Sequence, residues 1–113
     1  MSYDVQGHIG ATGGSLYVSL SPIRIAILDS TAYAGGLYLN RVNVPKEFQG
    51  RGIGTALMEA FKKSSRRAGH RHVIVEPGGY NPADQERRVK WYERHGFIKQ
   101  KEGFYLLVLE KEA

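Results

Sequence analysis

The feature that most constrains the fold of this chain is residues 49–54, Gln-Gly-Arg-Gly-Ile-Gly, in which three glycines alternate. An extended apolar segment ending at Val44-Pro45 precedes them, and apolar residues spaced three and four apart follow from Ile53 to Phe61, which predicts an amphipathic helix. Glycines at a strand-to-helix turn let the backbone approach a bulky anion. Free amides at the helix start and the helix dipole then favour its negative charge. We interpret the segment as a turn that binds phosphate or pyrophosphate.

Three phosphate-binding patterns can be compared with this turn. A nucleoside-triphosphate loop needs a lysine followed by Ser or Thr after its last glycine, whereas Thr55 and Ala56 follow Gly54 here. The dinucleotide fingerprint spaces its three glycines differently. The third pattern, Gln/Arg-x-x-Gly-x-Gly/Ala, is matched by residues 49–54 at every specified position. A glycine-rich loop that merely turns the chain is the alternative interpretation.

Taken together, the strand, the Val44-Pro45 pair, the glycine pattern and the apolar helix resemble the GNAT acyltransferase superfamily, whose members bind acetyl-CoA at this turn. The resemblance extends from Leu37 to about Leu109. It implies that acetyl-CoA is the co-substrate and that its phosphates are held by Gln49, Gly50, Arg51, Gly52, Ile53, Gly54 and Thr55.

The strand before the turn contains an irregularity. Leu37 and Leu39 are apolar at odd positions, whereas Val42 and Val44 are apolar at even positions. Because side chains alternate between the two faces of a strand, one extra residue at positions 40–41 would bring both pairs to the same face. Such a bulge resembles the GNAT arrangement, in which this strand splays from its neighbour and the acyl-pantetheine arm lies in the opening. A strand with two differently buried ends is the alternative.

The resemblance also assigns main-chain roles to this strand. Backbone amides around Val42 and Val44 are implied to pair with the pantetheine arm and to stabilise the oxyanion. Side-chain patterns cannot test this assignment, because the donors are main-chain groups.

The N-terminal third of the chain is predicted to form strands. Apolar residues alternate at 16–20 and at 23–27, after a flexible glycine turn at 10–14. GNAT proteins usually place two helices between their first and second strands, where they wall the acceptor site. Only residues 10–14 are available here, so we expect that pair of helices to be missing and the acceptor side to be open.

The remaining elements follow from turn and capping residues. The helix after the glycine turn should end at Gly69, and a short strand at 72–76 is expected to be buried on both faces. Asn81-Pro82 begins a second helix that stops at Gly96, before a C-terminal hairpin. We therefore expect one α+β domain over residues 1–113, with a mixed, mostly antiparallel sheet of six or seven strands and two main helices.

Tyr92 is the candidate acid of the reaction that the resemblance implies, direct attack of an amine on a thioester. That reaction needs a neutral amine, a stabilised oxyanion and a protonated leaving thiolate. Residues 92–97 resemble the family's Tyr-x-x-x-Gly-Phe segment, in which the tyrosine hydroxyl meets the CoA sulfur. A phenol of pKa about 10 stays protonated at neutral pH. A core tyrosine packed beside Val89 is the alternative, and Trp91 is interpreted as packing at an edge or interface.

Two further polar residues are candidates for the site. Glu76 ends the strand that should line the cleft, so it could take a proton directly or through water, or it could be a surface acid beside Pro77. Asn81 lies about where the family often places an asparagine that touches the pantetheine. Its role as a helix N-cap is equally expected and compatible with that contact.

Composition limits the remaining classes of function. The net charge is +5, and the basic residues concentrate in two stretches, 62–71 and 87–94. These stretches are solvated helix faces, or else they attract CoA phosphates, an acidic protein or nucleic acid. The absence of cysteine excludes disulfides, thiolate metal sites and a cysteine nucleophile. The histidines lack a ligand spacing, so no metal is expected. No apolar run approaches membrane-spanning length and no signal peptide is seen, so cytoplasm is the expected compartment.

The favoured hypothesis is an acetyl-CoA-dependent N-acetyltransferase that acts on a primary amine of a small molecule or a protein. The alternative is a non-catalytic GNAT-fold module that binds CoA, or binds an acidic protein or nucleic acid through its basic face. We expect no membrane partner and only weak, non-specific nucleic-acid binding, and a homodimer is left open.

Overall fold

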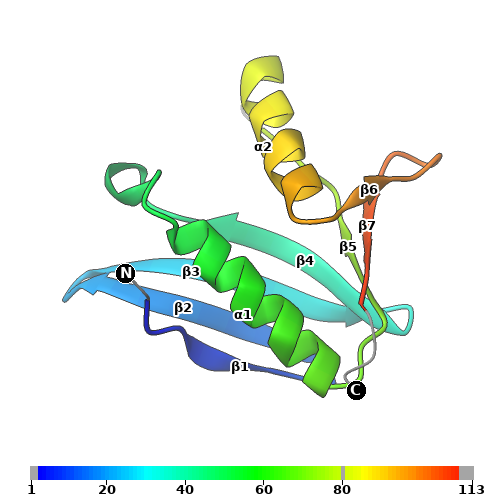
Figure 1. Cartoon of the computed structure of the whole chain (residues 1–113), viewed down its shortest axis with the longest axis horizontal. Helices are drawn as coiled ribbons and strands as arrows, with labels where there is room; N and C mark the ends of the chain where they lie inside the picture. Colours follow the sequence, from blue (N-terminus) through cyan, green and yellow to red (C-terminus); the bar gives the residue numbers. More distant parts are fainter. Residues whose placement is uncertain (1–2, 80, 110–113) are drawn as a thin grey trace.

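A single mixed sheet of seven strands organises the chain, and two helices lie on one side of it (Figure 1). The computed structural model describes residues 3–79 and 81–109. The strand order is β1-β2-β3-β4-β5-β7-β6, and only β4 and β5 run parallel. The strands are Gln6–Gly10 (β1), Gly13–Ser21 (β2), Arg24–Tyr33 (β3), Gly36–Asn43 (β4), His72–Val75 (β5), Ile98–Lys99 (β6) and Tyr105–Val108 (β7).

The two helices are Ile53–Arg67 (α1) and Pro82–Arg94 (α2), and a short 3-10 turn, Lys46–Phe48 (η1), precedes α1. These elements confirm the predicted α+β architecture with its mostly antiparallel sheet. The capping predictions are also confirmed, because the Asn81 side chain accepts a hydrogen bond of 2.8 Å from the Asp84 amide and Pro82 begins the helix. Gly69 and Gly96 follow the helix ends with φ of 86° and 97°, which glycine adopts without a steric penalty.

The core lies between α1 and one face of the sheet. The apolar stripe of α1 is fully buried, with Leu57, Met58 and Phe61 each at 0% exposure, as expected for an amphipathic helix that covers a sheet. Facing side chains of β2, β3 and β4 complete the core, including Leu16, Val18, Leu28, Leu37 and Leu39. This packing fixes the position of the α1 N-terminus relative to the end of β4.

The bulge predicted in β4 is confirmed. Asp29 of β3 pairs with Arg41 while the next residue, Ser30, pairs with Leu39, so Asn40 is the extra residue of β4. The Asn40 side chain donates a hydrogen bond of 2.7 Å to the Thr31 hydroxyl. Beyond the bulge the inward positions change from odd to even, as the apolar pattern requires.

The contact between β4 and β5 is short. The two strands pair only at Leu37 with Val73 and at Tyr38 with Ile74. After these residues they diverge, and β5 continues upward beside β7 while β4 runs toward η1 (Figure 1). We call the region between the diverging strands, just beyond Tyr38, the β4–β5 opening.

The turn between the first two strands is shorter than predicted. The glycine turn predicted at 10–14 is wrong in extent, because Gly13 and Gly14 belong to β2 and only Ala11 and Thr12 form the turn. Such glycines suit a strand where neighbouring backbones come close, and a Cβ at Gly13 would overlap the Ser30 carbonyl. The connection between β1 and β2, all of it described, contains no helix, as expected.

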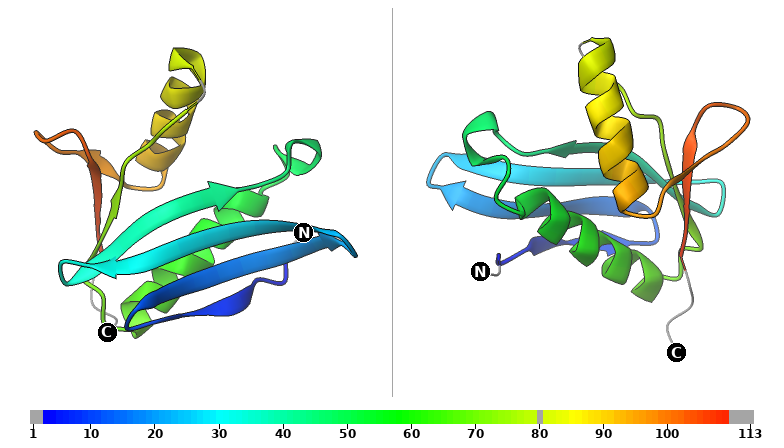
Figure 2. Two further views of the ribbon diagram at one scale, coloured as in Figure 1. Left: turned by 180° about the vertical axis from the view of Figure 1, so that it is seen from behind. Right: turned by 45° about the horizontal axis from the view of Figure 1, so that its top comes forward.

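The prediction that β5 is buried on both faces is wrong. Val73 and Val75 are buried, but Ile74 between them is only half-buried. Seen from behind, no helix of the described residues covers the sheet on that side (Figure 2). We call this side the outer face, and its side chains include Tyr17, Ile25, Ile27, Asp29, Tyr33, Tyr38 and Ile74.

We predict that Gly36→Ala destabilises the fold at the β4–β5 contact. A Cβ at Gly36 would overlap the carbonyl oxygen of His72, so the strands would have to separate. Overpacking of this kind costs about 1–3 kcal/mol, and urea unfolding should show a lower midpoint with an unchanged slope. Gly78→Ala is the control, because a Cβ there meets nothing within 4 Å. Equal midpoints for the two variants would contradict a tight contact at Gly36.

Candidate functional site

A cavity of about 510 Å³ lies where the end of β4, the glycine turn and α2 meet. Most of the residues predicted to bind a cofactor line it, which brings together positions up to fifty residues apart in the sequence. Those residues are Val42, Val44, Gln49, Gly50, Gly52, Ile53, Gly54, Thr55 and Tyr92. Residues from α2 that were not predicted also line it, namely Arg87, Arg88, Trp91 and Arg94.

The glycine turn leaves open space in front of the α1 N-terminus. Gly50 and Gly52 have φ of 79° and 83°, in the left-handed region that favours glycine. A Cβ at either position would meet nothing within 4 Å. Gly52 is the N-cap and supplies no side-chain cap, and the first helical hydrogen bond runs from the Ala56 amide to the Gly52 carbonyl. The amides of residues 53–55 therefore lack helical partners and can bind an anion there.

Side-chain contacts hold the turn in place. The Gln49 amide group donates a 2.9 Å hydrogen bond to the Val44 carbonyl, and the Tyr3 hydroxyl donates a 2.8 Å bond to the Arg51 carbonyl. The Arg51 guanidinium lies over the Phe48 ring, 5.4 Å from its centroid. Arg51 is thus turned toward Phe48 and does not line the cavity, and its predicted contact with a cofactor stays a prediction.

Close packing of α2 against α1 forms the opposite wall. A Cβ at Gly54 would lie 3.2 Å from the Trp91 ring, so the absence of a side chain at Gly54 lets Trp91 approach the start of α1. Trp91 is half-buried and lines the cavity. This corrects its interpretation as a residue packed at an edge or interface. The contact between Trp91 and Gly54 joins residues far apart in the sequence, so no local sequence pattern predicts it. The available signal was helical spacing, which places Trp91 on the same face of α2 as Arg87 and Arg94.

Tyr92 combines burial in the core with access to the cavity. The residue is 8% exposed, and its ring packs edge-on against Phe97 with centroids 5.4 Å apart. Burial raises the pKa of the Tyr92 phenol, and the positive charge of Arg88 opposes this only in part. The phenol is therefore protonated at neutral pH. Within residues 3–79 and 81–109 its hydroxyl has no hydrogen-bond partner, so it is available to a ligand.

Glu76 and Asn81, the other predicted site residues, do not line the cavity. Glu76 is exposed just after β5, and its carboxylate accepts a 2.9 Å hydrogen bond from the Tyr38 hydroxyl. Asn81 is exposed, and its side chain caps α2. The proposed contacts of both residues with substrate or cofactor stay predictions.

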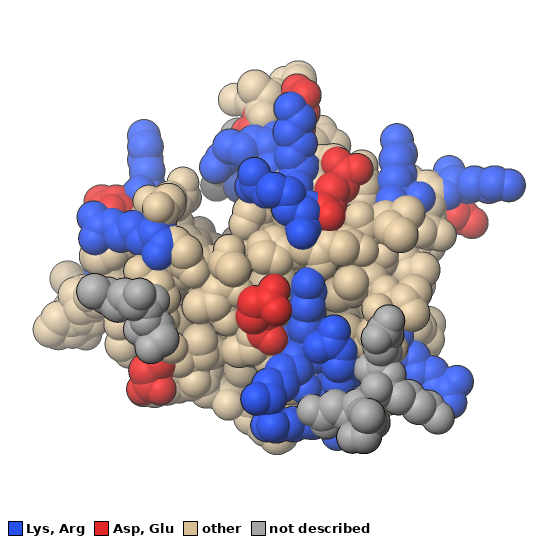
Figure 3. Space-filling model, viewed as in Figure 1, with Lys and Arg blue, Asp and Glu red and all other residues tan. Residues whose placement is uncertain are grey.

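The wall formed by α2 gives the cavity a positive charge. Arg87, Arg88 and Arg94 line it, and no carboxylate of the described residues does. Basic side chains gather over α2, and a second group lies over the C-terminal part of α1 (Figure 3). Asp84 forms ion pairs with Arg87 and Arg88 from the first turn of α2. The cavity can therefore hold a polyanion between the arginines and the helix amides.

His95 lies at the junction of the two helices. Its ring packs on Trp91 with centroids 4.5 Å apart, and its Nδ1 atom is 3.8 Å from the Glu59 carboxylate. Burial and the nearby Lys62 charge lower the pKa of His95, and Glu59 opposes this shift. In the described parts of the chain, no group of His, Cys, Asp or Glu could hold a metal ion, and neither α1 nor α2 is long and apolar enough to cross a membrane.

We predict that His95 makes the fold less stable in mild acid. Because the folded-state pKa of His95 lies below its ordinary 6.5, the unfolded chain binds more protons between those two values. The free energy of unfolding should therefore fall as the pH drops from about 7 through the folded-state pKa. In thermal unfolding at several pH values, His95→Gln should lose part of this decrease. His8→Gln, at an exposed position, is the control, and an identical pH profile for both variants would contradict the prediction.

Residues 13–99 match the family model described as an acetyltransferase (GNAT) domain. No curated protein matches the chain. Solved structures match it at low identity. The ribosomal-protein-S18-alanine N-acetyltransferase of Escherichia coli aligns with 92% of this chain and 74% of its own length, at a TM-score of 0.69 and 17% identity.

Two further solved structures show the range of proteins with this fold. A proposed streptothricin acetyltransferase from Bacillus anthracis, solved with acetyl coenzyme A, aligns with 88% of this chain and 62% of its own, at a TM-score of 0.68 and 15% identity. The anti-CRISPR protein AcrVA5 aligns with 81% of this chain and 96% of its own, at a TM-score of 0.61 and 18% identity. At these identities the likeness shows the fold alone.

Proposed function

The chain belongs to the GNAT acetyltransferase domain family, and on this premise we propose that it transfers an acetyl group from acetyl-CoA to a primary amine. The family supports N-acetyltransferase activity in general, and it uses acetyl-CoA as the acyl donor. One observation carries the proposal. The open glycine turn with its free helix amides, the arginines of α2 and the buried Tyr92 all line the same cavity.

The cavity residues fit the parts of acetyl-CoA. The open space at Gly50 and Gly52 and the amides of residues 53–55 would receive the pyrophosphate, as helix N-termini commonly do. Arg87, Arg88 and Arg94 would neutralise phosphate charge from the opposite wall. Beyond Tyr38 the backbone of β4 no longer pairs with β5, so its free edge can pair with the pantetheine arm like an added strand.

Acetyl transfer to an amine needs a nucleophile, a proton donor for the leaving thiolate and an acceptor for the protons of the amine. The lone pair of a neutral amine attacks the thioester carbonyl carbon, an amide bond forms and the C–S bond breaks. The Tyr92 hydroxyl donates to the departing thiolate, and water returns any proton that the phenol loses. The ammonium form of the amine gives up its protons to water, directly or through Glu76. The products are the acetamide, CoA thiol and one proton.

The fold does not identify the acceptor. One solved neighbour is named for an alanine of a ribosomal protein and another for streptothricin, which are chemically different acceptors. A single fold commonly supports several substrates because specificity resides in the site. The acceptor must therefore be inferred from this chain's own residues around the opening.

Binding and turnover can be tested separately with the unmodified protein. Trp91 is the chain's only tryptophan and lies on the cavity wall, so CoA binding should change its fluorescence and raise the melting temperature. Release of CoA thiol in the presence of a panel of amines then measures transfer. Binding without release for any amine would favour the non-catalytic CoA-binding module, and the absence of binding would contradict the proposal itself.

We predict that Tyr92→Phe lowers turnover by roughly a hundredfold, the effect expected for loss of a general acid. The ring and its packing against Phe97 are retained, so stability and acetyl-CoA affinity should change little. Single-turnover kinetics under conditions where chemistry limits the rate is the measurement. Tyr105→Phe, at a tyrosine equally buried but not lining the cavity, is the control. Equal rates for Tyr92→Phe and the wild type would leave Tyr92 with a structural role only.

We predict that Gly54→Val abolishes CoA binding in a protein that remains folded. The new side chain would press against Trp91 at the start of α1 and crowd the space in front of the helix amides. Calorimetric titration with CoA measures the affinity, and circular dichroism verifies the fold. Gly78→Val, at an exposed glycine with open space around it, should bind CoA as the wild type does. Unchanged affinity in a folded Gly54→Val protein would remove the phosphate-binding role of the turn.

A further inference from the structure

The side of the sheet opposite the cavity is open and partly apolar. No helix of the described residues covers the outer face (Figure 2), and Ile25 and Tyr33 are 45% and 58% exposed on it. The helix side, in contrast, is occupied by α1, α2 and the proposed acetyl-CoA cavity. An amine that reaches the thioester through the β4–β5 opening would therefore approach across the outer face.

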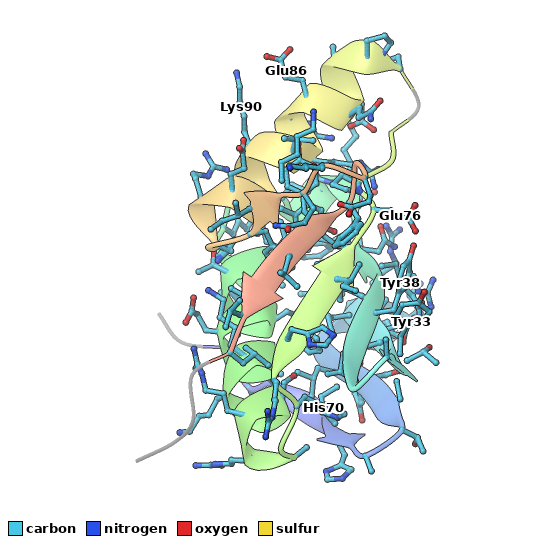
Figure 4. The ribbon with its side chains drawn as sticks, turned by 90° about the vertical axis from the view of Figure 1, so that its right-hand side faces the viewer. Tyr33, Tyr38, His70, Glu76, Glu86 and Lys90 are labelled. Atoms are coloured by element: carbon cyan, nitrogen blue, oxygen red, sulfur yellow. The ribbon has the colours of Figure 1, made fainter. Side chains whose placement is uncertain are left out.

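A cluster of two tyrosines and a carboxylate lies on the outer face beside this opening. The Tyr38 hydroxyl donates a 2.9 Å hydrogen bond to Glu76, and the Tyr33 ring packs edge-on against Tyr38 with centroids 6.3 Å apart. Figure 4 shows the three residues one after another along the outer face, on the side away from α1. Tyr38 is the last β4 residue paired with β5, and Glu76 follows the end of β5. The hydrogen bond between them thus spans the point where the strands separate.

The negative charge of Glu76 is not neutralised within the described part of the chain. Asp29, on the same face, is paired with Arg41 and accepts a hydrogen bond from Ser15. Glu76 has a phenol as its partner and no Lys, Arg or His within ion-pair distance in residues 3–79 and 81–109. A carboxylate with a neutral donor on one side retains acceptor sites for an external cation.

We propose that Tyr33, Tyr38 and Glu76 form the subsite that binds the acceptor's ammonium group, and that the acceptor is a lysine side chain of another protein. This inference rests on the proposed acetyl transfer. Aromatic rings attract an ammonium through their π faces, and a carboxylate forms a charge-assisted hydrogen bond with it. The cluster selects a cation before the amine loses its proton and enters the opening.

The openness of the face specifies the class of acceptor. Sites for small molecules usually bury most of the ligand's surface in a concave pocket. Tyr33 and Glu76, in contrast, are exposed, and no helix of residues 3–79 and 81–109 covers the outer face. A protein acceptor provides its own surface, which can lie against the exposed Ile25 and Tyr33. The four-carbon stem of lysine then lets the ammonium extend from that surface to Glu76 and into the opening.

The test compares acceptors in acetyl-CoA-dependent thiol release by the wild-type chain. The probes are a capped peptide with one internal lysine, the same peptide with that lysine acetylated or trimethylated, and spermidine as a free amine. We expect the lysine peptide to be acetylated and to be used better than spermidine. The trimethyllysine peptide, a cation that cannot react, should inhibit competitively against the lysine peptide, and the neutral acetyllysine peptide should not.

Variants assign this effect to the cluster. Glu76→Gln should raise the acceptor KM by roughly tenfold or more, because it replaces a charge-assisted hydrogen bond to the ammonium with one to a neutral acceptor, and the KM for acetyl-CoA should stay the same. Tyr33 takes no part in proton transfer, so Tyr33→Ala should raise the acceptor KM and leave kcat nearly unchanged. Glu86→Gln is the control, because that exposed carboxylate pairs with Lys90 on α2, away from the opening (Figure 4).

The outcomes separate this inference from the proposed function. Acceptor KM values unchanged in both Glu76→Gln and Tyr33→Ala, with thiol release intact, would overturn the subsite while the acetyltransferase assignment stands. Preference for spermidine over the lysine peptide would overturn the class of acceptor. A chain that binds no acetyl-CoA would overturn both.

Discussion

The short pairing between β4 and β5 is the constraint on which the rest of the structure depends. Two residue pairs join the strands, at Leu37 with Val73 and at Tyr38 with Ile74, before they separate. The Asn40 bulge bends β4 at the same place and brings Val42 to the helix side. A fully paired sheet would have no free β4 edge beyond Tyr38. The cavity on one side and the Tyr38–Glu76 pair on the other both exist because the pairing stops there.

Charge is distributed unevenly around this opening. On the helix side the cavity is lined by three arginines and by the uncapped start of α1, and no carboxylate of the described residues faces it. On the outer face, the partner of Glu76 among the described residues is a phenol, that of Tyr38. A polyanionic donor and a cationic acceptor would thus be attracted to opposite faces of one opening. This separation also keeps Glu76 from repelling the phosphates of the donor.

Local patterns in the sequence predicted much of the fold and part of the site. The change from odd to even apolar positions located the bulge at Asn40, and Asn81-Pro82 located the start of α2, because both signals come from neighbours in sequence. The burial of Ile74 was mispredicted, since an apolar residue in a strand carries no information about what covers its outer side. The position of Trp91 depends on Gly54 of α1, thirty-seven residues away, and no local pattern encodes that contact.

The cavity on the helix side is held in place less firmly than the Tyr38–Glu76 pair on the outer face, because the contact between α1 and α2 determines the shape of the cavity. Gly54 lets Trp91 approach, and His95 adds a ring contact with Trp91 and a 3.8 Å approach to Glu59 of α1. The junction loses stability when His95 binds a proton, because burial and the nearby Lys62 disfavour the positive charge more than Glu59 favours it. On the outer face, by contrast, Tyr38 lies on β4 and Glu76 directly follows β5, and the hydrogen bonds of the sheet join β5 to β4 and β7. Mild acid should therefore disturb the site for the donor before it disturbs the site for the acceptor.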